Sequence, residues 1–98
     1  MKPVLLAAFV ISTPAIASAG PIDRACQQSN RVANPLLCEC IQMVANMTLT
    51  GSDQRLAAKF FGDPAKAQEV RTSGSDAHQA FWQRYVAFGD TAEQICTP

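Results

Sequence analysis

The architecture of this chain depends on residues 34–47, NPLLCECIQMVANM. The segment opens on Asn followed by Pro, an N-cap residue and a residue suited to the first helical position, so it predicts a helix running to about residue 47. Cys38 and Cys40 lie two residues apart in this helix, where side chains point about 200° apart. Helix geometry forbids a bond between them, and each must therefore reach a different partner.

The chain has four cysteines, and the other two are Cys26 and Cys96. Two connectivities remain, Cys26–Cys38 with Cys40–Cys96 or Cys26–Cys40 with Cys38–Cys96. We favour the first. Cys26 and Cys38 lie equally far from the loop centre at Val32, so they would face each other across a helical hairpin.

The second bond of this connectivity follows from the faces of the same helix. Cys40 shares a stripe with three apolar side chains that we expect to meet the last helix, which ends at Cys96: Leu36, Val44 and Met47. The two disulfides would then fasten both ends of the chain to the central helix.

The N-terminus predicts an export signal over residues 1–19. An apolar run from residue 4 to 11 is closed by Pro14, and Ala17 and Ala19 form the small-residue pattern read by signal peptidase. The run is well short of the ~20 residues that span a bilayer. We therefore expect cleavage after Ala19, with Ala17 as the alternative. The product would be periplasmic or secreted, with no membrane span and one disulfide-stabilised domain over residues 20–98.

The remaining sequence predicts an all-α fold, a small disulfide-stapled bundle of about four to five helices with the longest at the C-terminus. The expected helices cover residues 21–29, 35–47, 53–61, 64–71 and 76–96. Ser52 is expected to cap the third, and Gly89 is expected to kink or break the last. The last helix carries an apolar stripe with helical spacing. Much of the core is expected from six aromatic residues: Phe60, Phe61, Phe81, Trp82, Tyr85 and Phe88.

Composition and motifs offer little support for chemistry. The eight acidic and eight basic residues balance to a net charge of zero, which does not favour nucleic acid as a partner. Cys40, Met43 and Met47 share a helix face, and sulfur ligands suit Cu(I), but methionines at helical spacing are more often core residues. The sequence predicts no catalytic residue, no metal site and no cofactor.

Two short segments invite a functional interpretation. Ser75, Asp76 and His78 have the residue types of a hydrolase triad, but their positions favour an N-cap and the first turn of the last helix. In residues 81–85, FWQRY, Trp82 and Arg84 are the residue types that dominate interface hot spots. They form a possible interaction surface, although a core tryptophan at the bundle edge is the alternative.

From Arg24 to Cys96 the chain resembles a group of small exported four-cysteine proteins of alphaproteobacteria. The resemblance covers nearly the whole domain and rests on residues 24–26, 37–42, 53–55, 60–61 and 81–85 together with Cys96. It implies a secreted disulfide domain and brings no catalytic residues. Some members carry the label "arginine transporter", yet a transporter needs several membrane spans, and the predicted signal is the one long apolar stretch here.

The sequence therefore favours a non-enzymatic protein-interaction or accessory protein of the bacterial periplasm, acting on an unknown protein partner in the cell envelope. The alternative is a small-ligand or copper-binding periplasmic carrier. Free thiols would favour the carrier, because Cys40 could then bind copper and Cys38 could act as a redox nucleophile.

Overall fold

The computed structural model describes residues 20–29 and 34–97. Within them the chain forms α1 (Pro21–Gln28), α2 (Pro35–Thr48), α3 (Gly51–Gly62), α4 (Pro64–Arg71) and α5 (Asp76–Cys96), and it forms no strand. The predicted all-α architecture is confirmed, and the longest helix is the C-terminal one. The predicted signal peptide, residues 1–19, lies outside the described residues, as does Pro98.

The favoured disulfide connectivity is confirmed. Cys26 bonds to Cys38 and Cys40 bonds to Cys96. The first bond links α1 to the start of α2, and the second links α2 to the last residue of α5. The two sulfurs of the Cys-x-Cys segment thus leave α2 toward different helices, as the side-chain directions on a helix require.

Most helices begin where their local sequence signals predict. Asn34 caps α2, and its side-chain oxygen accepts hydrogen bonds from the backbone N–H groups of Leu36 and Leu37. The prediction for α3 was wrong by two residues. Thr50, not Ser52, is the N-cap, because Thr50 and Asp53 form a reciprocal capping box across the first turn.

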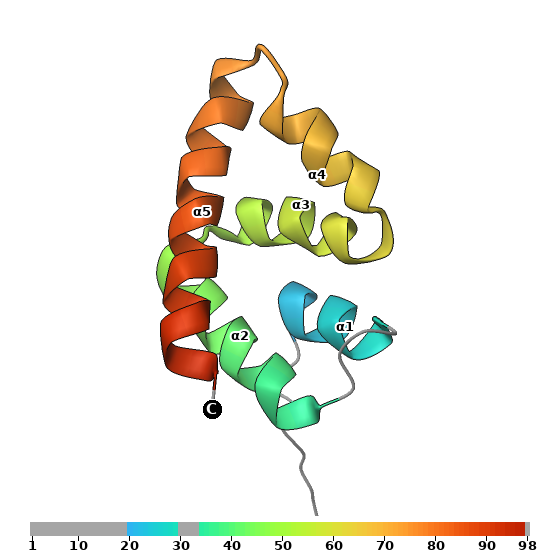
Figure 1. Cartoon of the computed structure of the whole chain (residues 1–98), viewed down its shortest axis with the longest axis vertical. Helices are drawn as coiled ribbons and strands as arrows, with labels where there is room; N and C mark the ends of the chain where they lie inside the picture. The colour runs from blue at the N-terminus through green and yellow to red at the C-terminus, as the bar shows by residue number, and fades with distance from the viewer. Residues whose placement is uncertain (1–19, 30–33, 98) are drawn as a thin grey trace, which may run out of the picture.

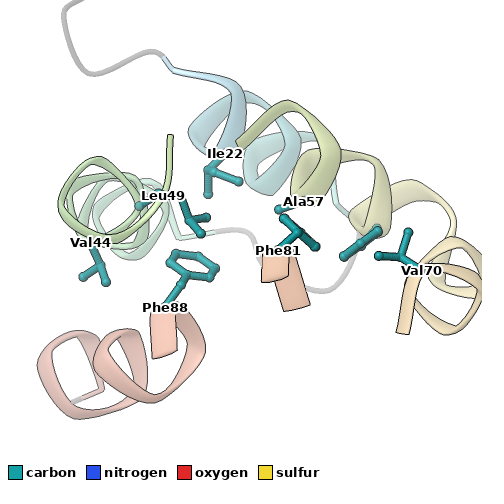
Figure 2. Close-up of a cluster of buried hydrophobic side chains, with 9 residues drawn as sticks. Ile22, Val44, Leu49, Ala57, Val70, Phe81 and Phe88 are labelled. Carbon is teal, nitrogen blue, oxygen red and sulfur yellow. The ribbon is translucent and has the colours of Figure 1, made fainter. Parts of the chain in front are cut away.

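The five helices pack around a shared apolar core (Figure 1). α5 runs along one side of the molecule, α2 crosses its C-terminal half, and α4 leads back to its N-terminal end. α3 lies between α4 and α1. The core residues come from all five helices and the α2–α3 connection, and Figure 2 shows most of them: Ile22, Val44, Ala45, Leu49, Ala57, Phe60, Val70, Phe81 and Phe88.

The aromatic prediction holds in part. Phe60, Phe81 and Phe88 are buried, whereas Phe61, Trp82 and Tyr85 are only partly buried against the core. Phe60 and Phe81 meet edge to face with ring centroids 6.0 Å apart, and burial of such pairs contributes about 0.5–1.5 kcal/mol beyond their area. Gly89 neither breaks nor ends α5, which is continuous from Asp76 to Cys96.

Candidate interaction surface

Both sulfurs of the Cys-x-Cys segment are consumed in structural bonds, and none of the four cysteines is free. Cys26 and Cys38 are fully buried. In this oxidised form Cys38 is no redox nucleophile. The Cys40 thiolate is likewise lost from the predicted sulfur set for Cu(I), which leaves the thioethers of Met43 and Met47.

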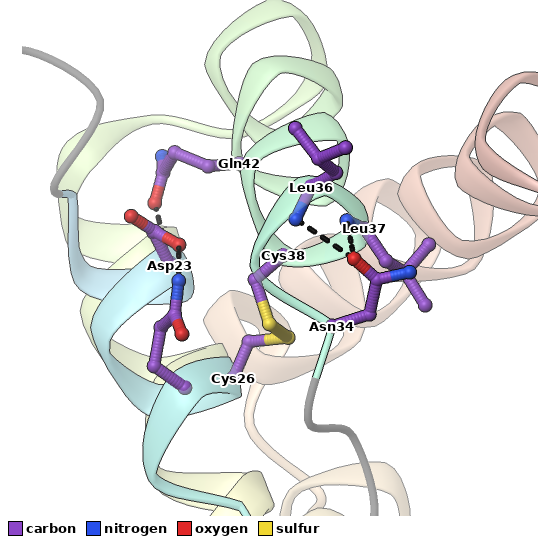
Figure 3. Close-up of a disulfide and its surroundings, with 8 residues drawn as sticks. Asp23, Cys26, Asn34, Leu36, Leu37, Cys38 and Gln42 are labelled. Atoms are coloured by element: carbon purple, nitrogen blue, oxygen red, sulfur yellow. Dashed lines mark hydrogen bonds between the residues drawn. A yellow bond between two sulfur atoms is a disulfide. The ribbon is translucent and has the colours of Figure 1, made fainter.

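A buried polar network joins α1, α2 and α3, and Figure 3 shows its link between Asp23 of α1 and Gln42 of α2. Gln42 Oε1 accepts a hydrogen bond from the Asp23 backbone N–H at 2.8 Å, and Gln42 Nε2 donates to Gln54 Oε1 at 2.7 Å. Gln54 Nε2 donates in turn to the carbonyl of Ala45 and to Asn46 Oδ1. Sequence reasoning missed this network, because glutamine is usually a surface residue.

Gly20 shows how closely this network is packed. A Cβ on Gly20 would lie 2.6 Å from both Cδ and Oε1 of Gln42, which is shorter than van der Waals contact. The Gln42 amide cannot move aside without breaking its own hydrogen bonds. The lack of a side chain at Gly20 therefore allows α1 to begin against α2.

Arg84, one of the two predicted interaction residues, forms an ion pair within the fold. Its Nε donates to Asp53 Oδ2 at 2.7 Å and its Nη2 donates to Asp53 Oδ1 at 3.0 Å, so the contact is bidentate. Trp82, the other, is half-buried, with its ring 6.3 Å from Phe60 and 5.1 Å from Tyr85. Arg84 thus fastens α5 to the first turn of α3.

This ion pair should make the free energy of unfolding fall at acid pH. The hydrogen bonds from Arg84 lower the pKa of the Asp53 carboxyl below its ordinary value of 3.8, against an opposing effect of burial. A carboxyl with a lowered folded-state pKa stabilises the fold above its unfolded pKa and loses that contribution as pH falls through the folded value. We expect Asp53→Asn to destabilise the protein at pH 7 and to flatten the loss of stability below about pH 4.

Urea unfolding of both proteins between pH 2 and pH 7 measures this difference. Asp63→Asn is the matched control, because Asp63 is exposed and caps α4 without a side-chain hydrogen bond. An acid limb of equal steepness in wild type and Asp53→Asn would contradict the assignment.

The triad-like segment is part of a helix cap. Ser75 Oγ accepts a hydrogen bond from the His78 backbone N–H, and Asp76 lies in the first turn of α5. His78 is half-buried and its Nδ1 has no hydrogen-bond partner. Among the described residues no group of three or more His, Cys, Asp or Glu side chains is placed to hold a metal ion.

The largest departure from the sequence analysis concerns the outer face of α2. Leu36, Met43 and Met47 were expected to pack inward, yet they are 75%, 60% and 65% exposed. Their spacing places them on one stripe of the helix, about 16 Å long. Ile95, which belongs to the apolar stripe of α5, is also 57% exposed.

The two helices share a depression of about 310 Å³ at this place, lined by Leu36, Leu37, Cys40, Ile95 and Cys96 together with Asn34. The Cys40–Cys96 disulfide holds α2 and α5 together there. We call Leu36, Met43, Met47 and Ile95 the apolar surface. Because Leu36 and Ile95 line one depression, it is continuous across the two helices.

None of the helices in residues 20–29 and 34–97 combines the length and apolar character needed to cross a bilayer. The two disulfides are consistent with an oxidising, exported location. Comparison of the chain with protein-family models, curated proteins and solved structures finds no match in any of the three.

Proposed function

We propose that this protein is a non-enzymatic interaction domain of the bacterial periplasm whose apolar surface binds a basic amphipathic helix of a cell-envelope protein. The observation that carries the proposal is the exposure of Leu36, Met43 and Met47 on one stripe of α2. The predicted signal peptide and the two disulfides support the location.

Two other sides of α2 are covered by neighbouring helices. Cys38, Gln42 and Ala45 are buried on one side, and Val44 is buried near Phe88 of α5, as Figure 2 shows. An apolar stripe on a helix is normally covered by a neighbouring element. The remaining apolar stripe of α2 therefore supports a binding role, since large exposed apolar patches mark interaction sites.

The charges around the apolar surface favour a basic partner. Glu39 lies three residues after Leu36 and four before Met43, so it borders the exposed stripe of α2, and residues 34–50 contain no lysine or arginine. Opposite charge on the partner would steer its approach and suppress acidic competitors. The two methionines suit this role, because their flexible thioether side chains adapt to a partner's shape. An apolar stripe about three turns long matches one face of a helix.

Trp82 and Arg84 contribute less to this proposal than the sequence suggested. Arg84 is bonded to Asp53 and Trp82 packs on Phe60, so an alanine at either position would also disturb the fold. Their role as an additional contact remains a prediction.

Peptide binding tests the proposal. The probe is an 18-residue amphipathic peptide of leucine and lysine, and the comparison peptide carries glutamate in place of lysine. We expect micromolar binding of the lysine peptide, measured by calorimetry. Met43→Gln/Met47→Gln should weaken it at least tenfold, since amide groups replace the apolar contact, and should leave the free energy of unfolding within about 0.5 kcal/mol of wild type because both side chains are exposed.

Met43→Leu/Met47→Leu is the matched control, and it should keep the affinity because leucine preserves the apolar surface. In cells, a photo-crosslinking residue at position 47 should give a discrete product that the same residue at position 68, an exposed position on α4, does not give. Equal affinity for both peptides, or binding that survives the glutamine variant, would count against the proposal.

A further inference from the structure

A second surface lies between α1 and α3, and its chemistry is the reverse of the apolar surface. A shallow groove of about 310 Å³ runs along these helices, lined by Arg24, Arg55 and Lys59 with Pro21, Ala25, Gln28 and Ala58. The small side chains of Ala25 and Ala58 belong to the two facing helices, and three cationic side chains share the walls. We call this the basic groove.

No carboxylate lines the basic groove. The acidic residues nearest to Arg24 and Arg55 in sequence are Asp23 and Asp53, and both are buried. Asp23 Oδ1 accepts a hydrogen bond from Gln27, and Asp53 is held by Arg84. Each of these two arginines thus lies within two residues of an acid in the sequence. The fold buries the aspartates and leaves the arginines exposed at the surface.

Two of the cations lack any acidic partner. Arg55 and Lys59 are exposed on consecutive turns of α3, and no ion pair joins either of them to another described residue. Asp63, one turn beyond Lys59, is not within ion-pair distance of it. Like charges four residues apart on a helix destabilise it slightly. An anion bound between the two side chains would remove that cost.

We propose that the basic groove binds a phosphate group, either of a free phosphorylated molecule or of a phospholipid headgroup. The Arg55 guanidinium offers paired N–H donors that match phosphate oxygens, and the Lys59 ammonium adds a compact charge one turn away. Arg24 contributes positive charge from α1. The volume is at the lower end of the range for ligand sites, which suits a small anion. This inference does not depend on the proposed function, because the two surfaces share no residue.

The net charge of zero concealed this site, since the balance holds over the whole chain and not over each face. The groove brings residue 24 close to residues 55 and 59, which lie more than thirty positions later in the sequence, so no local run of charge marks it. The groove forms only when α1 packs against α3.

NMR titration with inorganic phosphate and pyrophosphate tests the site, with added chloride holding ionic strength constant. We expect saturating amide shifts in α1 and α3, with a dissociation constant on the order of 1 mM for phosphate and tighter binding of pyrophosphate. Arg55→Gln/Lys59→Gln should weaken binding at least tenfold. Lys66→Gln/Arg71→Gln removes the same charge from α4 and should leave the affinity unchanged.

Co-sedimentation distinguishes the two sources of phosphate. Vesicles of phosphatidylglycerol that retain wild type but not Arg55→Gln/Lys59→Gln, with phosphatidylcholine vesicles retaining neither, would identify a headgroup site. Saturating phosphate shifts without retention would identify a soluble ligand. Linear shifts of equal size in the two double variants would mean general ionic attraction, and the proposal would be wrong.

Discussion

Cys40→Ala/Cys96→Ala should lower the free energy of unfolding by about 4 kcal/mol and the melting temperature by roughly 15–30 °C. The bond joins residues 56 apart, and closing so long a loop removes much of the freedom of the unfolded chain. It also holds α5 against α2 at the end where Ile95 and Leu36 contribute little packing, because both are exposed. Guanidinium unfolding followed by circular dichroism measures the loss.

The Cys26–Cys38 disulfide should contribute less to the free energy of unfolding. Cys26 and Cys38 are 12 residues apart, so the chain-entropy contribution of their bond is smaller, about 3 kcal/mol. The two bonds together approach the whole stability of a small domain, typically 5–15 kcal/mol. Fully reduced protein should therefore lose its helical signal at moderate temperature. Melting at the same temperature with and without reductant, after thiol titration has confirmed reduction, would show that the bonds have no structural role.

Most helix boundaries could be predicted because their causes are local, and local geometry also excluded a Cys38–Cys40 bond. The choice between the two remaining pairings depended on the expected packing of α2, which was right for Val44 and wrong for Leu36 and Met47. Asn34-Pro35 marks the start of α2 by itself, and two cysteines two residues apart on a helix cannot bond to each other wherever the helix lies. Thr50 was missed in favour of Ser52, although both are good caps, because the reciprocal bond with Asp53 decides between them. Thr50 lies three residues before Asp53, which is the spacing of a capping box, whereas Ser52 is adjacent to Asp53.

The face of α2 could not be predicted in the same way. Periodicity finds the apolar residues of a helix, but α2 is apolar around most of its circumference, so several stripes satisfy the same period. Val44 is buried and Met47, three residues later, is exposed, because α1, α3 and α5 cover only part of the helix. Which stripe stays uncovered is a property of the packing of the other helices, and this explains why the apolar surface was mistaken for core.

The long-range polar contacts could not be predicted from the sequence either. Arg84 and Asp53 are 31 residues apart, and nothing local distinguishes their charges from those of exposed neighbours such as Arg55. Gln42 and Gln54 likewise have no sequence signal for burial. The fold places these four residues so that each polar contact joins a different pair of helices, α2 to α3 and α3 to α5. The polar contacts thus bring α3, which contains no cysteine, into the framework that the disulfides form.

Gln54→Ala should destabilise the protein by about 2–4 kcal/mol, a large effect for a residue in no predicted site. Gln54 is 6% exposed and bridges α3 to α2 through its hydrogen bonds with Gln42 and with the carbonyl of Ala45. Truncation removes these buried hydrogen bonds and opens a cavity, although Gln42 Nε2 keeps its bond to Asn46 and the Ala45 carbonyl keeps its bond from the Leu49 N–H. Gln54→Met fills the space without restoring the bonds, so it separates the two causes, and most of the loss should remain.

Gln42, the hydrogen-bond partner of Gln54, allows a double-mutant cycle. In a cycle with Gln42→Ala, Gln54→Ala and the double variant, we expect a coupling energy of about 0.5–3 kcal/mol, because either single change already disrupts the shared hydrogen bond. Gln83→Ala, at an exposed position on α5, is the control and should change the free energy of unfolding by less than about 0.5 kcal/mol. If the effects of the two glutamine variants simply add, the network contributes no stability as a unit. The attachment of α3 to α2 would then have to come from apolar contacts such as those of Leu49 and Ala57, which lie in the same buried cluster.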